Sequence, residues 1–125
     1  MRTTERLPAT AECIGAARTL VTGALRSVGC STENVDTARL LVSELATNVV
    51  RHAHSAEMTV AVDTERGVAR VSVGDQDGRM LPEPVLPGGA APSGRGLYLV
   101  AVLSMRWGVD QHDDDGKAVW FEVAC

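Results

Sequence analysis

The sequence predicts an α+β fold, a two-layer α/β sandwich in which helices cover one face of a mostly antiparallel sheet. Two long segments with helical periodicity come early, within residues 10–53. Four shorter strand-like segments come later, with one further helical segment between the two pairs. Because helices and strands cluster instead of alternating, this architecture is favoured over a parallel sheet of the Rossmann type.

The composition is typical of one globular domain. The chain has 125 residues, of which 45% are apolar and 22% charged. A chain of this length buries roughly two thirds of its unfolded surface, so residues 1–125 are expected to form one domain. No apolar run approaches the ~20 residues that span a bilayer, and the N-terminus does not resemble a secretory leader. We therefore expect a cytoplasmic protein that does not enter membranes.

Charge and cysteine content exclude several kinds of site. The net charge is −4 and no cluster of Lys or Arg is present, so nucleic-acid binding is not predicted. Cys13, Cys30 and Cys125 are far apart and lack the spacing of a metal site. An odd number of cysteines does not form a closed disulfide framework, so all three are expected to be reduced and structural.

Two amphipathic helices are predicted first. In the first, apolar residues recur at the helical period after Thr10, the expected N-cap, and the helix ends before Gly29. The second begins at Ser31 or Thr32, since this stretch offers more than one capping register, and ends near Ala53.

The later elements are shorter. Alternating or continuous apolar residues flank a Glu-Arg-Gly turn and predict a hairpin, and a helical segment is followed by two strand-like runs joined by an acidic turn. In order, the predicted elements are strands 58–63 and 68–73, helix 97–105, and strands 107–111 and 118–124.

A long loop separates the hairpin from the third helix. Residues 80–95 contain four prolines and several glycines and alanines. Loops longer than ~12–15 residues are uncommon in compact domains unless they bind a ligand, cover a site or are disordered. This segment is therefore a candidate lid.

The second predicted helix carries the most informative polar residues. Glu44 and Asn48 lie one turn apart on the face opposite the apolar one. A solvated polar face on a core helix is the simplest interpretation. However, asparagine inside a helix is up to ~0.7 kcal/mol less favourable than alanine, which suggests that its amide is needed. An amide oxygen can bind Mg²⁺, and a neighbouring carboxylate can accept a proton.

Two further segments carry polar or glycine-rich turns. Asp75 ends a strand and is followed by Gly78, so its carboxylate could accept a hydrogen bond from an adenine amino group, although such a sequence is usually only a turn. Gly94 and Gly96 precede Leu97 at a helix start, where free backbone N–H groups can hold phosphate oxygens. The same glycines could simply end a flexible loop, and no Walker A or dinucleotide motif is present.

Together these segments resemble the N, G1 and G2 boxes of the GHKL ATPase superfamily, which has the Bergerat fold, and the resemblance extends from Thr10 to Val123. Within that superfamily the chain looks most like the anti-sigma-factor serine/threonine kinases. The motifs that carry this likeness are Ser43–Asn48, His52-Ala53, Gly94–Leu97, Trp107–Val109 and Gly116–Trp120.

The resemblance implies a role for each candidate residue. Asn48 would ligate Mg²⁺ on the ATP phosphates, and Glu44 would be the general base that activates an attacking serine hydroxyl. Asp75 would bind the adenine amino group, with Gly78 close to the base, and residues 80–95 would form the lid. The phosphate-binding turn and helix start would come from Gly94, Arg95, Gly96 and Leu97.

The implied function is transfer of the γ-phosphoryl group of Mg-ATP to a serine or threonine of an anti-anti-sigma partner. A sigma factor would be a further partner, and a homodimer is expected from the same resemblance. A non-catalytic module whose partner binding is tuned by nucleotide is the alternative. A detached histidine-kinase domain fits less well, since no dimerisation helices with a phosphoacceptor histidine are present.

Three residues depart from the family pattern or remain without a role. Asp77 replaces a glycine of the adenine-side turn, where it is unfavourable unless it faces solvent. Ala118 replaces a threonine, which would cost one hydrogen bond, or ~0.5–1.5 kcal/mol. Lys117 is expected to be solvated.

Overall fold

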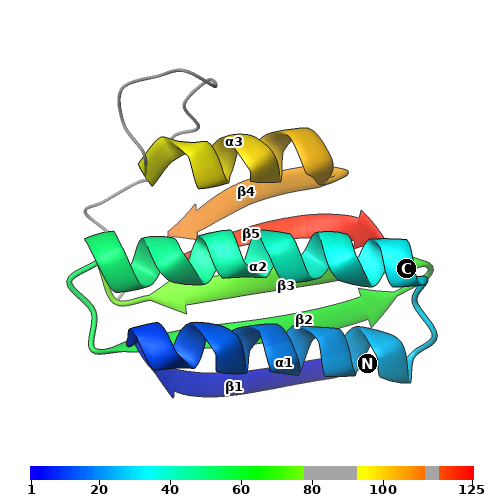
Figure 1. The fold of residues 1–125 in the computed structure, drawn as a ribbon, viewed down its shortest axis with the longest axis horizontal. Helices are drawn as coiled ribbons and strands as arrows, with labels where there is room; N and C mark the ends of the chain where they lie inside the picture. Colours follow the sequence, from blue (N-terminus) through cyan, green and yellow to red (C-terminus); the bar gives the residue numbers. More distant parts are fainter. Residues whose placement is uncertain (78–92, 112–115) are drawn as a thin grey trace.

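The computed structural model describes residues 1–77, 93–111 and 116–125, which form five strands and three helices (Figure 1). The predicted hairpin, three helices and two late strands are all present. In chain order the elements are β1 (Arg2–Pro8), α1 (Ala11–Ser27), α2 (Thr32–His52), β2 (Glu57–Glu65), β3 (Val68–Asp75), α3 (Ser93–Leu103), β4 (Arg106–Gln111) and β5 (Lys117–Ala124).

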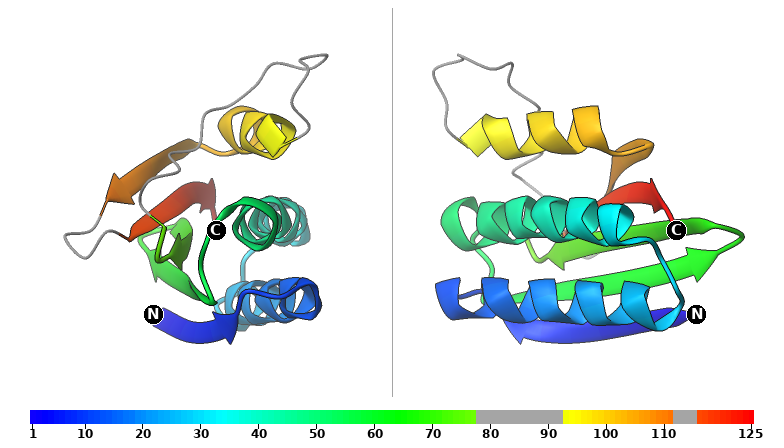
Figure 2. Two further views of the ribbon diagram at one scale, coloured as in Figure 1. Left: turned by 90° about the vertical axis from the view of Figure 1, so that its left-hand side faces the viewer. Right: turned by 45° about the vertical axis from the view of Figure 1, so that its right-hand side comes forward.

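The strands form one sheet in the order β1-β2-β3-β5-β4, and all four neighbouring pairs are antiparallel. Figure 2 shows the three helices on one side of this sheet. No helix of the described residues covers the other side, which we call the open face. The predicted α+β two-layer architecture is confirmed. Within the sheet, β5 lies beside β3 and sets Lys117 opposite Asp75, which brings two distant parts of the sequence together.

Strand β1 was not predicted. It pairs along its whole length with β2, from Arg2 opposite Asp63 to Pro8 opposite Glu57. Leu7 is its only buried residue, so the strand lacks the alternation of apolar and polar residues that reveals a strand. An edge strand of this kind is held by its backbone hydrogen bonds, and these leave no pattern in the side chains.

The helix boundaries settle the capping alternatives. The Ser31 side chain accepts a hydrogen bond from Asn34 N at 3.2 Å, so Ser31 is the N-cap of α2. Thr10 occupies the N-cap of α1, but its side chain makes no capping hydrogen bond. Gly29 follows α1 with φ +83°, the left-handed conformation that commonly ends helices. None of the helices in the described ranges is both long and apolar enough to cross a membrane.

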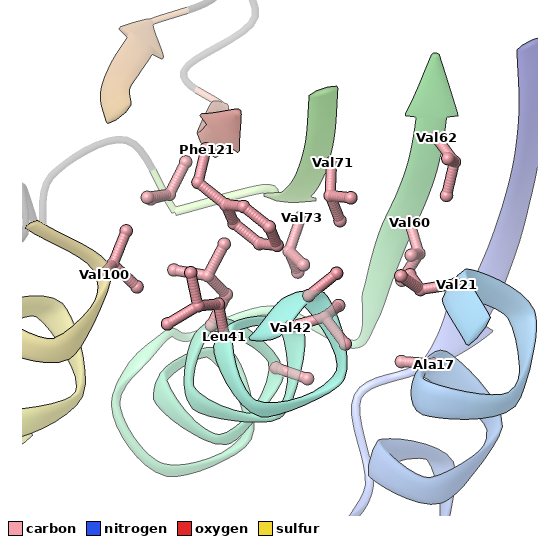
Figure 3. Close-up of a cluster of buried hydrophobic side chains, with 14 of the residues drawn as sticks. Ala17, Val21, Leu41, Val42, Val60, Val62, Val71, Val73, Val100 and Phe121 are labelled. Carbon is pink, nitrogen blue, oxygen red and sulfur yellow. The ribbon is translucent and has the colours of Figure 1, made fainter. Parts of the chain in front are cut away.

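The core lies between the helices and the sheet, with α2 at its centre. The predicted apolar face of α2 is buried at Val42, Leu45, Ala46 and Val49. Figure 3 shows Phe121 pointing from β5 toward α2, where it meets valines of the sheet. The largest fully buried side chains include Phe121, Leu25, Leu41, Leu45, Met58, Val21 and Val35.

The open face carries its own network of charges. Trp120 packs across Gly108, and the Arg70 guanidinium lies 3.9 Å from the centre of the tryptophan ring. Glu122 is 2.8 Å from Arg106 and 2.9 Å from Arg70. The hydrogen bond from Arg106 lowers the pKa of Glu122, and Arg70 acts in the same direction against the opposing effect of burial. Two arginines therefore share the single carboxylate of Glu122 on the side away from the helices.

The prediction that all three cysteines are reduced is wrong. Cys30, immediately before the N-cap of α2, is bonded to Cys125, immediately after β5, with their Cα atoms 4.4 Å apart. The two residues are 95 positions apart in the sequence, and only the packing of α2 over the sheet brings them together. Cys13 is free and partly buried.

Candidate functional site

The C-terminal half of α2 presents the two candidate polar residues. Glu44 and Asn48 are partly exposed, while Leu45 and Val49, which follow each of them, are buried in the core. Residues four apart on a helix lie on the same face, about 6 Å apart along the axis. The division of α2 into an apolar and a polar face is therefore as predicted.

The start of α3 contacts Glu44. The helix begins at Ser93, four residues before the predicted start at Leu97, so Gly94, Arg95 and Gly96 lie in its first turn. Gly96 is buried, and a methyl group built on it would lie 2.5 Å from Glu44 Oε2. The contact places a carboxylate beside backbone N–H groups that have no partner within their own helix.

This contact predicts that Gly96→Ala is destabilising although alanine favours helices. The added methyl must displace the Glu44 carboxylate and comes within 3.1 Å of Glu44 Cβ, so we expect a cost of about 1 kcal/mol, the lower end for overpacking. Gly23→Ala is the matched control, because Gly23 is exposed on α1 and its added methyl meets nothing within 4 Å. Urea unfolding of both variants measures the difference, and equal stability of the two would contradict the contact.

At the end of β3, Asp75 binds Lys117. Lys117 Nζ is 2.9 Å from both carboxylate oxygens of Asp75 and donates a 2.6 Å hydrogen bond to the Asp77 carbonyl. The two paired side chains are only 2% and 6% exposed. The prediction that Lys117 is solvated is therefore wrong. Lys117 lies two residues before the buried Val119 on the same strand, so both side chains face the helices.

Asp77, the residue that replaces a glycine, joins this cluster. Its backbone N–H donates to Asp75 Oδ1 at 2.7 Å, and its own Oδ2 accepts a 2.9 Å hydrogen bond from His54 N. Asp77 is buried, so its carboxylate does not face solvent, the condition under which the sequence made it tolerable near a nucleotide. Its carboxylate binds the segment that follows α2 and so ties that segment to the end of β3.

Ala118 lies on the other side of the sheet. Its side chain helps to line a concavity of about 410 Å³ on the open face, together with Arg2, Thr59 and Ser72. The Ala118 side chain therefore faces away from α2, and the same concavity also reaches Asp75 and Lys117 at the strand ends. The weaker nucleotide binding expected from this residue stays a prediction.

The structure groups the candidate residues around the C-terminal half of α2. The Glu44–Gly96 contact lies at one end and the Asp75 cluster, reached through His54, at the other, with Asn48 between them along the chain. Leu97 is buried in the core, so only its backbone can face a ligand. Gly78 and residues 80–92 of the candidate lid lie outside the described residues.

The donors present suit a magnesium ion held mainly by a nucleotide. Among the described residues, no group of three or more His, Cys, Asp or Glu could hold a metal ion. Asn48 is partly exposed and carries one amide oxygen. Mg²⁺ is commonly bound by one or two protein oxygens together with substrate phosphates and water, so a single amide fits this mode of binding.

Comparisons with known proteins agree with this geometry. Residues 7–123 match the model of the histidine kinase-like ATPase domain. Among solved structures, the crystal structure of the RsbU and RsbW domains of Rv1364c from Mycobacterium tuberculosis is similar over 99% of this chain, with a TM-score of 0.76 and 18% identity. This chain spans 32% of the length of that one, and the likeness shows the fold. No curated protein matches the sequence. The chain belongs to the family of histidine kinase-like ATPase domains, as its resemblance to the GHKL ATPases predicts.

Proposed function

We propose that this domain is a protein serine/threonine kinase of the anti-sigma-factor type, which binds Mg-ATP beside the C-terminal half of α2. Its substrate would be an anti-anti-sigma protein in the cytoplasm, and its phosphorylation would control the release of a sigma factor. Family membership supports ATP binding. The observation that carries the kinase proposal is the contact between Glu44 and Gly96, which puts a carboxylate beside the turn proposed to hold phosphates.

Each end of the site has a separate task in this proposal. Asp75 accepts a hydrogen bond from the adenine amino group, with Gly78 near the base. The backbone N–H groups of Gly94 and Gly96 bind phosphate oxygens at the start of α3. Asn48 holds Mg²⁺ through its amide oxygen, and the ion neutralises charge on the phosphates when it is bound. Arg95 lies in the same turn, and Leu97 follows it as the start of the helix body.

Glu44 performs the proton transfer. The hydroxyl oxygen of the acceptor serine or threonine attacks the γ-phosphorus, the bond from that phosphorus to the β–γ bridging oxygen breaks, and ADP leaves. The hydroxyl proton passes to the Glu44 carboxylate. Most of the rate enhancement in such a reaction comes from positioning and charge stabilisation. Here the backbone N–H groups at the start of α3 would provide both.

Calorimetry of Mg-ATP binding tests the site. Asn48→Ala is expected to weaken Mg-ATP binding at least about tenfold, and Asp75→Ala about 10- to 100-fold, because each loses a contact to a charged or metal-bound group. Removing Mg²⁺ with EDTA should weaken binding to wild type much more than binding to Asn48→Ala.

Thr47→Ala is the matched control on α2. In the part of the chain that the structure describes, its hydroxyl bonds only to the Ser43 carbonyl of the same helix, at 2.6 Å, so the variant is expected to bind Mg-ATP as wild type does. Absence of binding to wild type at millimolar Mg-ATP overturns the proposed function. Equal weakening by all three substitutions would show a general effect on α2 and the sheet rather than lost ligand contacts.

A further inference from the structure

Lys117 is the chain's single lysine and is almost completely buried. Burying an ammonium group is costly unless a carboxylate and further acceptors surround it. Here Nζ has Asp75 on one side and the Asp77 carbonyl on another. Replacing a buried ion pair by apolar residues is often neutral or stabilising, so stability alone does not account for a lysine at this place.

The hydrogen bonds around Asp75 are distributed unevenly between its two oxygens. Oδ1 receives hydrogen bonds from both Lys117 Nζ and Asp77 N, at 2.9 and 2.7 Å. Among the described residues, Oδ2 has Lys117 Nζ at 2.9 Å as its neighbour. An ionised carboxylate oxygen can accept two hydrogen bonds, so Oδ2 retains capacity for one donor from a ligand.

We infer that Lys117 is a positioning residue for the nucleotide base, which acts through Asp75 and selects a ligand with an exocyclic amino group. This inference rests on the proposed function, because it takes Asp75 as the acceptor for the adenine amino group. Lys117 fixes the orientation of the carboxylate and balances its charge, so Oδ2 is ready to accept before the base arrives. Such preorganisation spares the cost of ordering the acceptor on binding.

The same arrangement disfavours guanine. Guanine carries a carbonyl oxygen at the position where adenine carries its amino group. A carboxylate oxygen cannot donate a hydrogen bond to that carbonyl oxygen and repels it, and a buried polar pair without a hydrogen bond is costly. Lys117 therefore supports both affinity for ATP and discrimination against GTP.

The test compares two nucleotides on two proteins. Wild type and Lys117→Met are titrated with Mg-ATP and with the Mg complex of purine riboside triphosphate, which differs from ATP only in lacking the 6-amino group. Wild type is expected to prefer ATP about 10- to 100-fold, the usual value of a hydrogen bond to a charged group. In Lys117→Met this preference is expected to disappear through loss of ATP affinity, while affinity for the analogue stays unchanged.

Two further variants keep the test decisive if Lys117→Met folds poorly. Lys117→Arg retains the charge and should restore most of the preference for ATP, whereas Lys117→Gln should not. Arg70→Met is the matched control, since it removes a cation from β3 on the open face and should leave the preference intact.

The outcomes separate the inference from the proposed function. Equal loss of affinity for both nucleotides in the Lys117 variants shows a structural role and overturns the inference alone. Tighter ATP binding by Lys117→Met also overturns it, because Lys117 would then compete with the base for Asp75. Failure of wild type to bind either nucleotide overturns the proposed function and the inference together.

Discussion

Glu44→Gln is expected to lower the rate of phosphoryl transfer about 100- to 10,000-fold, the usual contribution of a general base, while Mg-ATP affinity stays close to that of wild type. Glutamine has the size and shape of glutamate and still fits against Gly96, but it cannot take the proton of an attacking hydroxyl. The substitution therefore removes chemistry and leaves the packing of α2 against α3 intact.

The measurement uses γ-³²P-labelled ATP and purified anti-anti-sigma proteins, tested one at a time as acceptors, with calorimetry of Mg-ATP on the same protein samples. Unchanged transfer by Glu44→Gln would exclude Glu44 as the base. Binding of Mg-ATP by wild type without transfer to any acceptor would favour the alternative, a module in which nucleotide only tunes partner binding. The departures at Asp77 and Ala118 do not by themselves decide between these functions.

Patterns within one element predicted most of the fold. The apolar face of α2 and the Arg66-Gly67 turn, where both residues have positive φ, are local signals, and both the helix and the hairpin form as predicted. Strand β1 was not predicted because its side chains are nearly all exposed and its pairing is made by the backbone. The start of α3 was placed late because its first turn contains two glycines, which usually indicate a loop.

In the candidate site, too, residues marked by a local pattern were predicted, and those that depend on distant strand pairing were not. The spacing of Glu44 and Asn48 on one helix identified them as a pair, and the structure keeps both on the partly exposed face. The role of Lys117 depends on β5 pairing with β3 in a register that sets it opposite Asp75. No local pattern records a register between strands so far apart in the sequence. The sequence signal that could have suggested it is the strand period, since Lys117, Val119 and Phe121 alternate with outward-facing residues.

The disulfide is the largest single stabilising feature that the sequence did not reveal. Cys30→Ser and Cys125→Ser are each expected to lower the free energy of unfolding by about 4–5 kcal/mol, because the bond closes a loop of 95 residues and restricts the unfolded chain. Treatment of wild type with dithiothreitol should have the same effect. Urea unfolding at equal protein concentration measures all three.

Cys13→Ser is the matched control, since Cys13 is free and only partly buried, and it should change stability far less. The double variant Cys30→Ser/Cys125→Ser should be no less stable than either single variant, because both substitutions break one bond. Stability equal to wild type in the single variants would mean that the bond does not form.

Cys125 follows the end of β5 opposite to Lys117, so loss of the bond should lower stability without changing the preference for ATP over its analogue lacking the amino group. A loss of stability without a change in nucleotide preference would therefore distinguish a general effect on the folded chain from a local effect at Asp75.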